Sequence, residues 1–95
     1  MSDMYESAKL VGEYLLFHYG TEEEILPEGG NWSAGLREAL AFAVRTVRWF
    51  SPGHAERGLD LGCAVGRSTF EMSLACQNVI GIDFSHAFIA AAETL

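Results

Sequence analysis

The chain has 95 residues, of which 49% are hydrophobic and 20% are charged, with a formal net charge of -7. This length allows one domain at most, with a core of modest size. The hydrophobic content is too high for a disordered chain, so the sequence predicts a folded protein. The acidic balance argues against nucleic-acid binding, because a phosphate backbone attracts basic surfaces. Small molecules and other proteins remain as partners.

The sequence shows no sign of a membrane segment, an export signal or a metal site. No apolar run reaches the roughly 18 residues of a membrane-spanning helix, and MSDMYES lacks the basic region of a signal peptide. We therefore expect a cytoplasmic protein without a membrane partner. The two cysteines, Cys63 and Cys76, lack metal-ligand spacing and are expected to stay reduced.

Two helices are predicted in the amino-terminal half. Residues 4–19 carry apolar side chains at helical spacing, and Gly20 follows where a cap glycine belongs. Residues 21–33 predict a loop, because Pro27 and two glycines follow an acidic run at 22–24 that is most simply a solvated helix start. Ser33 is a candidate N-cap for the second helix. Its apolar face holds Leu36, Leu40, Ala43, Val44, Val47 and Phe50, and its stop signal is Ser51, Pro52 and Gly53.

From Gly58 onward the pattern changes to alternating strand and helix. We predict a strand at 59–63, a helix at about 66–76, a strand at 79–83 and a helix from Ser85. This alternation indicates an α/β fold with a parallel sheet and right-handed crossovers. The expected organisation is a helical extension at 1–57 and a β-α-β-α unit at 58–95. Two strands leave open edges and do not complete a doubly wound sheet, so we expect a homo-oligomer or a piece of a longer product.

The turn after the first predicted strand is the strongest functional signal. Gly62 and Gly66 let the backbone approach a ligand, and the next helix begins there with unpaired N–H groups. Asp83 lies 21 positions beyond Gly62, close to the ~20 residues expected for an acid that binds ribose hydroxyls. The turn and the acid together predict binding of a nucleoside.

The spacing inside the turn separates two kinds of nucleoside cofactor. A dinucleotide fingerprint that starts at Gly62 requires glycines where the chain has Ala64 and Arg67. The pattern of an acid, a spacer and G-x-G-x-G instead fits Asp60, Gly62, Ala64 and Gly66 with one small replacement. A carboxylate at Asp60 attracts the ammonium and sulfonium groups of S-adenosylmethionine and repels a pyrophosphate. S-adenosylmethionine is therefore the favoured cofactor, and a nicotinamide-dependent oxidoreductase is a weaker alternative.

At this point the chain resembles the class I S-adenosylmethionine-dependent methyltransferases, through LDLGCAVGRS and VIGIDFS. More narrowly, LDLGCAVGRSTFE, VIGIDFSHAFI and the preceding YLLFHYG are similar to the methyltransferase domain of ovothiol biosynthesis. The resemblance implies the amino-terminal portion of a doubly wound Rossmann-like methyltransferase fold, preceded by two helices. It also implies a small-molecule methyl acceptor, namely a ring nitrogen of a mercaptohistidine-type compound.

The resemblance also assigns roles to residues of the turn. It places the methionyl part of the cofactor among Asp60, Gly62, Cys63, Ala64 and Gly66. It gives Asp83 the ribose hydroxyls and lays Phe84 against the adenine. The chain departs from the family at Ala64, where the family usually has glycine. The catalytic groups of the family follow later strands, so the resemblance names no catalytic residue here.

Several of these residues also have purely structural interpretations. Cys63 is expected to be a small buried side chain rather than a nucleophile, because no activating base adjoins it. Tyr14, His18 and Tyr19 fit an amphipathic helix that buries ring bodies and leaves polar tips wet, although they also suit a ligand site.

Two further aromatic residues and two histidines have no assigned role, and one alternative function stays open. Phe42 and Trp49 lie off the main apolar stripe and are either exposed or packed on a partner. His54 and His86 are expected at the surface or as capping residues. The functional alternative to a methyltransferase is a truncated, non-catalytic binding or interaction module.

Overall fold

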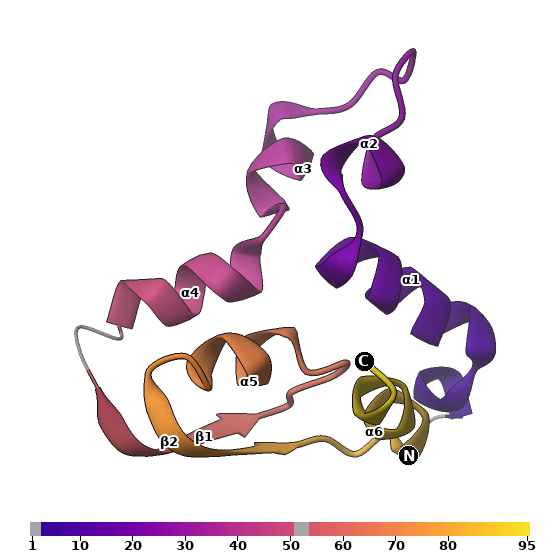
Figure 1. The fold of residues 1–95 in the computed structure, drawn as a ribbon. Helices are drawn as coiled ribbons and strands as arrows, with labels where there is room; N and C mark the ends of the chain where they lie inside the picture. The colour runs from indigo at the N-terminus through magenta and orange to yellow at the C-terminus, as the bar shows by residue number, and fades with distance from the viewer. Residues whose placement is uncertain (1–2, 51–53) are drawn as a thin grey trace.

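The computed structural model describes residues 3–50 and 54–95 and shows a mixed α/β fold (Figure 1). Six α-helices and a two-stranded parallel sheet form within this part of the chain, which confirms the predicted α/β class. The elements in chain order are the 3-10 helix η1 (Asp3–Glu6), α1 (Ala8–Tyr19), α2 (Glu22–Ile25), α3 (Ala34–Ala39), α4 (Phe42–Phe50), β1 (Ala55–Leu61), α5 (Arg67–Met72), β2 (Cys76–Ile82) and α6 (His86–Glu93).

The first predicted helix forms, but it begins later than the apolar spacing indicated. The Oγ of Ser7 accepts a hydrogen bond from the N–H of Leu10 at 3.2 Å and so caps α1, while η1 precedes it. Gly20 caps the other end with φ -70° and ψ 158°, which is extended rather than left-handed. The glycine is needed for space, since a Cβ there would lie 2.4 Å from the carbonyl oxygen of Leu16.

The predicted loop at 21–33 contains one additional helical turn, α2. A capping box starts it: the N–H of Glu24 donates to the Oγ1 of Thr21 at 3.2 Å, and the N–H of Thr21 donates to the Oε1 of Glu24 at 2.9 Å. Hydrogen bonding to the backbone and then to the side chain of Thr21 lowers the pKa of Glu24. The acidic run is therefore the helix start that its composition indicated, and the prediction of a loop over these residues was wrong.

The second predicted helix is broken into α3 and α4. Ser33 is its N-cap, as expected, and accepts from the N–H of Leu36 at 3.1 Å. The helix then stops at Leu40, and Ala41 takes a left-handed φ of 58°. The guanidinium of Arg45 donates to the carbonyl of Leu40, which stabilises the break. A single helix was therefore the wrong prediction. The predicted stop at 51–53 lies outside the described residues, as does the side chain of Phe50.

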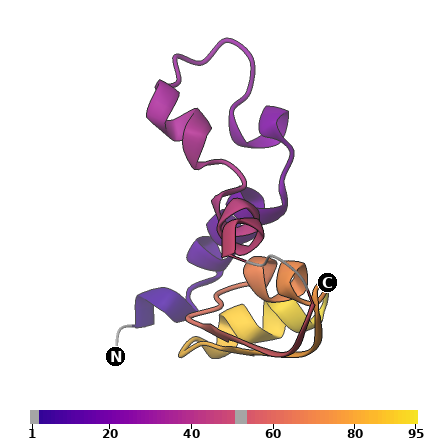
Figure 2. The same ribbon diagram turned by 90° about the vertical axis from the view of Figure 1, so that its left-hand side faces the viewer.

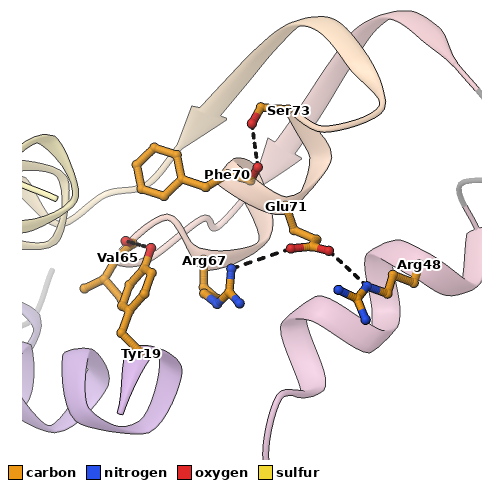
Figure 3. Close-up of polar contacts among 7 residues, drawn as sticks. All are labelled: Tyr19, Arg48, Val65, Arg67, Phe70, Glu71 and Ser73. Carbon is orange, nitrogen blue, oxygen red and sulfur yellow. Dashed lines mark hydrogen bonds and ion pairs between the residues drawn. The ribbon is translucent and has the colours of Figure 1, made fainter. Parts of the chain in front are cut away.

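The β-α-β pattern is confirmed, with different boundaries. Strands β1 and β2 pair in parallel, with Leu59 opposite Ile80 and Leu61 opposite Ile82. Both strands begin before the predicted positions, because polar, exposed residues at 56–57 and 77–78 near their starts interrupt the apolar alternation. Helix α5 ends earlier than predicted, at Met72, and the Oγ of Ser73 donates to the carbonyl of Phe70 at 2.5 Å (Figure 3).

The last predicted helix is also confirmed, and its N-cap is Ser85. Ser85 precedes α6, and its Oγ accepts from the N–H of Phe88 at 3.0 Å. The carboxylate of Glu6 adds two further bonds to the start of α6, from the N–H groups of His86 at 2.9 Å and Ala87 at 3.1 Å. These bonds hold the beginning of the chain against its last helix.

The sheet is covered on one face only. Helix α5 packs on the face that carries Gly58 and Gly81, where a Cβ on Gly81 would lie 2.5 Å from the Oγ1 of Thr69. In Figures 1 and 2 the helices lie on this side, and α2 and α3 lie farthest from the sheet. The opposite face exposes Leu59, Leu61, Ile80 and Ile82, whose exposed fractions lie between 51% and 72%.

The apolar core joins α1 to α6. Phe88 is 2% exposed, and its ring lies 4.5 Å from that of Tyr14 and 6.2 Å from that of Tyr5 between ring centroids. Val44 and Val47 of α4 are buried, whereas Leu36 of α3 is exposed. None of the helices formed by residues 3–50 and 54–95 has the length and apolar character needed to cross a membrane.

Candidate functional site

The turn between β1 and α5 has three residues in the left-handed region. Gly62, Ala64 and Gly66 have φ values of 71°, 48° and 85°, a conformation that costs any residue with a Cβ. Space around Gly62 is open, but a Cβ on Gly66 would lie 3.1 Å from the ring of Phe70 and 3.2 Å from the Cβ of Ala92. Gly66 is therefore required both by its backbone conformation and by close packing.

Four amide groups of the turn are hydrogen-bonded within the protein. Gly62 and Cys63 donate to the carbonyl of Ile82 at 2.7 and 3.0 Å, and Gly66 donates to the carbonyl of Cys63 at 2.8 Å. Ala64 donates to the Oδ2 of Asp83 at 2.9 Å. The bonds to Ile82 and Asp83 join the turn to the tip of β2, and the bond from Gly66 lies within the turn. Side chains and carbonyl groups, rather than these four N–H groups, are therefore what the turn presents to a ligand.

Asp83 lies at the end of β2 and holds the turn in place. Its Oδ2 accepts from Ala64, and its Oδ1 accepts from the N–H of Ser85 at 2.9 Å. A carboxylate has about four lone-pair sites, so each oxygen keeps capacity for a further donor such as a ribose hydroxyl. The predicted binding residue thus also has a structural role, which its spacing from Gly62 did not indicate.

Asp60 lies at the corresponding end of β1 and contacts α5. Its Oδ2 accepts from the Oγ of Ser68 at 2.5 Å and from the Oγ1 of Thr69 at 2.7 Å. Both hydroxyls bind the same oxygen, which leaves Oδ1 for another donor. Sequence reasoning missed Ser68 and Thr69; the available signal was a hydroxyl pair in the first turn of the helix that packs on the strand carrying the acid.

Cys63 is buried behind the turn, as predicted. Its side chain is 6% exposed, and burial raises the pKa of the thiol, with smaller contributions from the carboxylates of Asp60 and Asp83. The thiol is therefore protonated at neutral pH and is a poor nucleophile. Cys76 is also a free thiol. Within residues 3–50 and 54–95, no three His, Cys, Asp or Glu side chains gather to hold a metal ion.

Two hollows meet at the turn and share Tyr14, Gly62 and Ala64 in their linings. The first has a volume of about 470 Å³ and contains Asp83. The second has a volume of about 320 Å³ and contains Asp60. The first is also lined by Tyr5, Glu6, Phe84, His86 and Phe88, and the second also by His18, Thr46, Arg67 and Ser68. Of the two acids predicted to bind the ligand, one thus lines each hollow.

Helix α1 contributes directly to this site. Tyr14 lines both hollows and His18 lines the second, in addition to the packing role that the sequence favoured. Burial lowers the pKa of His18, and the positive charge of Arg67 lowers it further. Tyr19 donates its hydroxyl to the carbonyl of Val65 in the turn at 2.8 Å (Figure 3). Burial raises the pKa of this phenol, so it stays protonated at neutral pH.

The remaining predicted aromatic residues are exposed. Phe84, which the resemblance places against adenine, is 81% exposed and lines the first hollow next to Asp83. Phe42 and Trp49 on α4 are 62% and 91% exposed. Phe42 lines the second hollow, whereas the ring of Trp49 lies at the surface. His54 and His86 are exposed, as expected.

The structure brings together every turn residue that the sequence singled out. Asp60, Gly62, Cys63 and Ala64 all line the second hollow, and Asp83 lines the first. Gly66 lies beneath the turn, against α6. No protein-family model matches this chain, and no curated protein sequence matches it.

Proposed function

We propose that the chain binds S-adenosylmethionine across this turn and is the cofactor-binding part of a class I methyltransferase. One observation carries the proposal: Asp60 near the carboxyl end of β1 and Asp83 directly after β2 face two hollows that meet at Gly62 and Ala64. Ligands of open α/β sheets bind at the carboxyl ends of the strands. A long ligand with a different group at each end suits two joined hollows.

The chemistry of each side matches one part of this cofactor. Asp83 retains acceptor capacity for the two ribose hydroxyls, and Phe84 offers an exposed ring beside it for stacking on adenine. Asp60 offers its Oδ1 to an ammonium group, and its negative charge favours a nearby sulfonium. The same two carboxylates would repel the pyrophosphate of a dinucleotide, which disfavours the oxidoreductase alternative.

When bound, the cofactor supplies a sulfonium methyl group, which an acceptor nitrogen takes by in-line displacement as the C–S electron pair returns to sulfur. The contribution of this chain is to bind and orient. Tyr19 and Asp83 hold the turn from opposite sides through the Val65 carbonyl and the Ala64 amide. The acceptor in this proposal is a small molecule with a nucleophilic ring nitrogen, of the mercaptohistidine type.

In this proposal the chain is the amino-terminal portion of a doubly wound Rossmann-like fold. Elements β1, α5, β2 and α6 supply the first β-α-β-α unit, and the helices formed by residues 3–50 are an extension that reaches the cofactor site. Tyr14 and His18 of this extension line the hollows, which supports a role for α1 in closing the site over its ligand.

Isothermal titration calorimetry with S-adenosylmethionine and S-adenosylhomocysteine tests the proposal. We expect both to bind, and Asp83→Asn to weaken binding by about tenfold to a hundredfold, because hydrogen bonds to a charged group contribute about 1.5–3 kcal/mol. Asp83→Ala should abolish the signal. NADH should not compete. Glu56→Gln, an exposed carboxylate at the far end of β1, is the matched control and should bind as the original chain does.

Thermal melts of the same variants separate binding from folding, because Asp83 also holds the turn. Asp83→Asn keeps an acceptor for one of the two N–H groups that Asp83 binds, so it should retain part of the stability that Asp83→Ala loses. Unchanged affinity in Asp83→Asn, with the fold intact, would remove Asp83 from the site and the proposal with it.

A second candidate, a non-catalytic interaction module, is favoured by a different observation. The uncovered sheet face exposes four large aliphatic side chains, which is the kind of patch that binds another protein. Such a module would associate with its partner equally well with and without S-adenosylhomocysteine. Dependence of the association on this nucleoside would instead favour the cofactor-binding role.

A further inference from the structure

Arg67 is the charged residue of the turn region to which the proposed function gives no role. It follows Gly66 directly, and its side chain, 31% exposed, lines the second hollow. Among the described residues that line this hollow, Asp60 and Arg67 are the two that carry full charges at neutral pH. A hollow with one carboxylate and one guanidinium has the charge pattern that an α-amino acid zwitterion requires.

The surroundings of Arg67 leave its positive charge only partly balanced. Figure 3 shows its Nη1 directed at the Oε2 of Glu71, at 3.6 Å. The Oε1 of the same carboxylate accepts from the Nε of Arg48 at 3.0 Å. Glu71 is 8% exposed and is shared by two guanidinium groups. The three side chains therefore carry a formal charge of one positive unit, which is available to an anionic ligand.

Contacts from α1 fix where this charge lies. The guanidinium carbon of Arg67 is 5.6 Å from the centroid of the Tyr19 ring, over its face. The hydroxyl of Tyr19 is bound in turn to the carbonyl of Val65. Arg67 is thus held between a ring and a buried carboxylate. A guanidinium has five N–H donors in a planar fork, so most of them remain for a bidentate bond to a ligand carboxylate.

Arg67 shares the second hollow with His18 of α1. The positive charge of Arg67 contributes to the lowered pKa of His18, which lines the same hollow. Desolvation is the larger cause of that shift, so the surroundings exclude enough water to strengthen electrostatic interactions. A carboxylate entering the hollow meets the same field with the opposite, favourable sign.

We propose that Arg67 recognises the carboxylate of the cofactor's amino acid end, while Asp60 binds its ammonium group. This inference rests on the proposed function and deepens it, because it makes Arg67 the residue that selects for an intact α-amino acid. Glu71 and Tyr19 are positioning residues in this account, since they hold the guanidinium and do not touch the ligand.

Three nucleosides that differ only at this end test the proposal by calorimetry. S-adenosylhomocysteine carries both the ammonium and the carboxylate, decarboxylated S-adenosylhomocysteine carries the ammonium alone, and 5′-methylthioadenosine carries neither. We expect the original chain to bind the first about tenfold to a hundredfold more tightly than the second, as a charge-assisted pair allows. We expect Arg67→Gln to remove this difference and to leave the affinities for the second and third ligands unchanged.

Two further variants keep the result interpretable. Arg67→Lys keeps the charge without the planar fork and should retain part of the preference. Arg57→Gln removes the same charge from the exposed part of β1 and should retain all of it. Circular dichroism melts show whether each variant is folded. The comparison of the three ligands on the original chain tests the proposal even if a variant does not fold.

Two results would overturn the inference while leaving the proposed function in place. One is equal binding of S-adenosylhomocysteine and its decarboxylated form by the original chain. The other is a loss in Arg67→Gln that is the same for all three, which would make Arg67 a structural support of the turn. If no nucleoside binds the original chain, the proposed function fails and this inference fails with it.

Discussion

Ala64 occupies a backbone conformation that suits glycine better than alanine. Its φ is 48°, and the left-handed region costs a residue with a Cβ about 1–2 kcal/mol. Glycine avoids this cost but loses about 0.5–1 kcal/mol more through chain entropy. We therefore expect Ala64→Gly to raise the free energy of unfolding by about 0.5–1 kcal/mol, measured by urea denaturation.

Ala90→Gly is the matched control for this substitution. Ala90 is an exposed residue inside α6, where the same change should lower the free energy of unfolding by about 1 kcal/mol. Opposite signs at the two positions would show that the turn forces the left-handed conformation in solution. A loss at position 64 that equals the loss at position 90 would contradict the geometry of the turn.

His18 makes the stability of the protein depend on pH. Its pKa in the folded protein lies below the ordinary value of 6.5, chiefly because of burial and also because of Arg67. Below that ordinary value the unfolded chain takes up a proton that the folded protein resists, so acid favours unfolding. We expect the free energy of unfolding to fall as the pH is lowered from about 7 to about 5.5, above the range where most carboxylates titrate.

Urea denaturation across this range, repeated on two variants, attributes the effect to His18. His18→Gln cannot take up the proton and should flatten the dependence. His54→Gln, at an exposed position before β1, should keep the slope of the original chain. An unchanged slope in His18→Gln would show that another group is responsible.

At the scale of elements, the predictions succeeded where a signal was local and failed where it was not. The β-α-β order and the cap at Ser33 follow from short-range patterns, and the structure confirms both. The break at Ala41 does not interrupt the apolar period of the sequence. It is held by bonds from the Arg45 side chain to carbonyls of the preceding residues, which no periodicity reveals.

The candidate site shows the same division. The acids and glycines of the turn were identified because their spacing is a local property of one β-α-β unit. The bond from Tyr19 to Val65 was not predicted, because it joins residues 46 positions apart. The capping of α6 by Glu6 was missed for the same reason. Contacts across the fold leave no repeated spacing in the sequence.

At the scale of the whole molecule, the uncovered face of the sheet is the feature that most requires an explanation. Leu59, Leu61, Ile80 and Ile82 form a block of paired side chains there, whereas parallel sheets are normally covered on both faces. Alternation places Arg57 on this face as its charged residue and places no carboxylate there. Two copies of a chain with net charge -7 repel each other. This repulsion is weakest when the two copies meet through this face, because the strands place no carboxylate on it.

We therefore propose that a second copy of the chain covers this face, and we expect sedimentation to show association that increases with protein concentration. Leu61→Lys places a charge within the apolar block. It should weaken the association at least tenfold, because burying an unpaired ammonium group is costly. Leu74→Lys adds the same charge at another exposed leucine, 73% exposed between α5 and β2, and should have no effect. If the protein is instead a monomer at all concentrations and melts cooperatively, the sheet is stable with one face open to water. The two strands and α5 then suffice to hold Asp60 and Asp83 beside the turn.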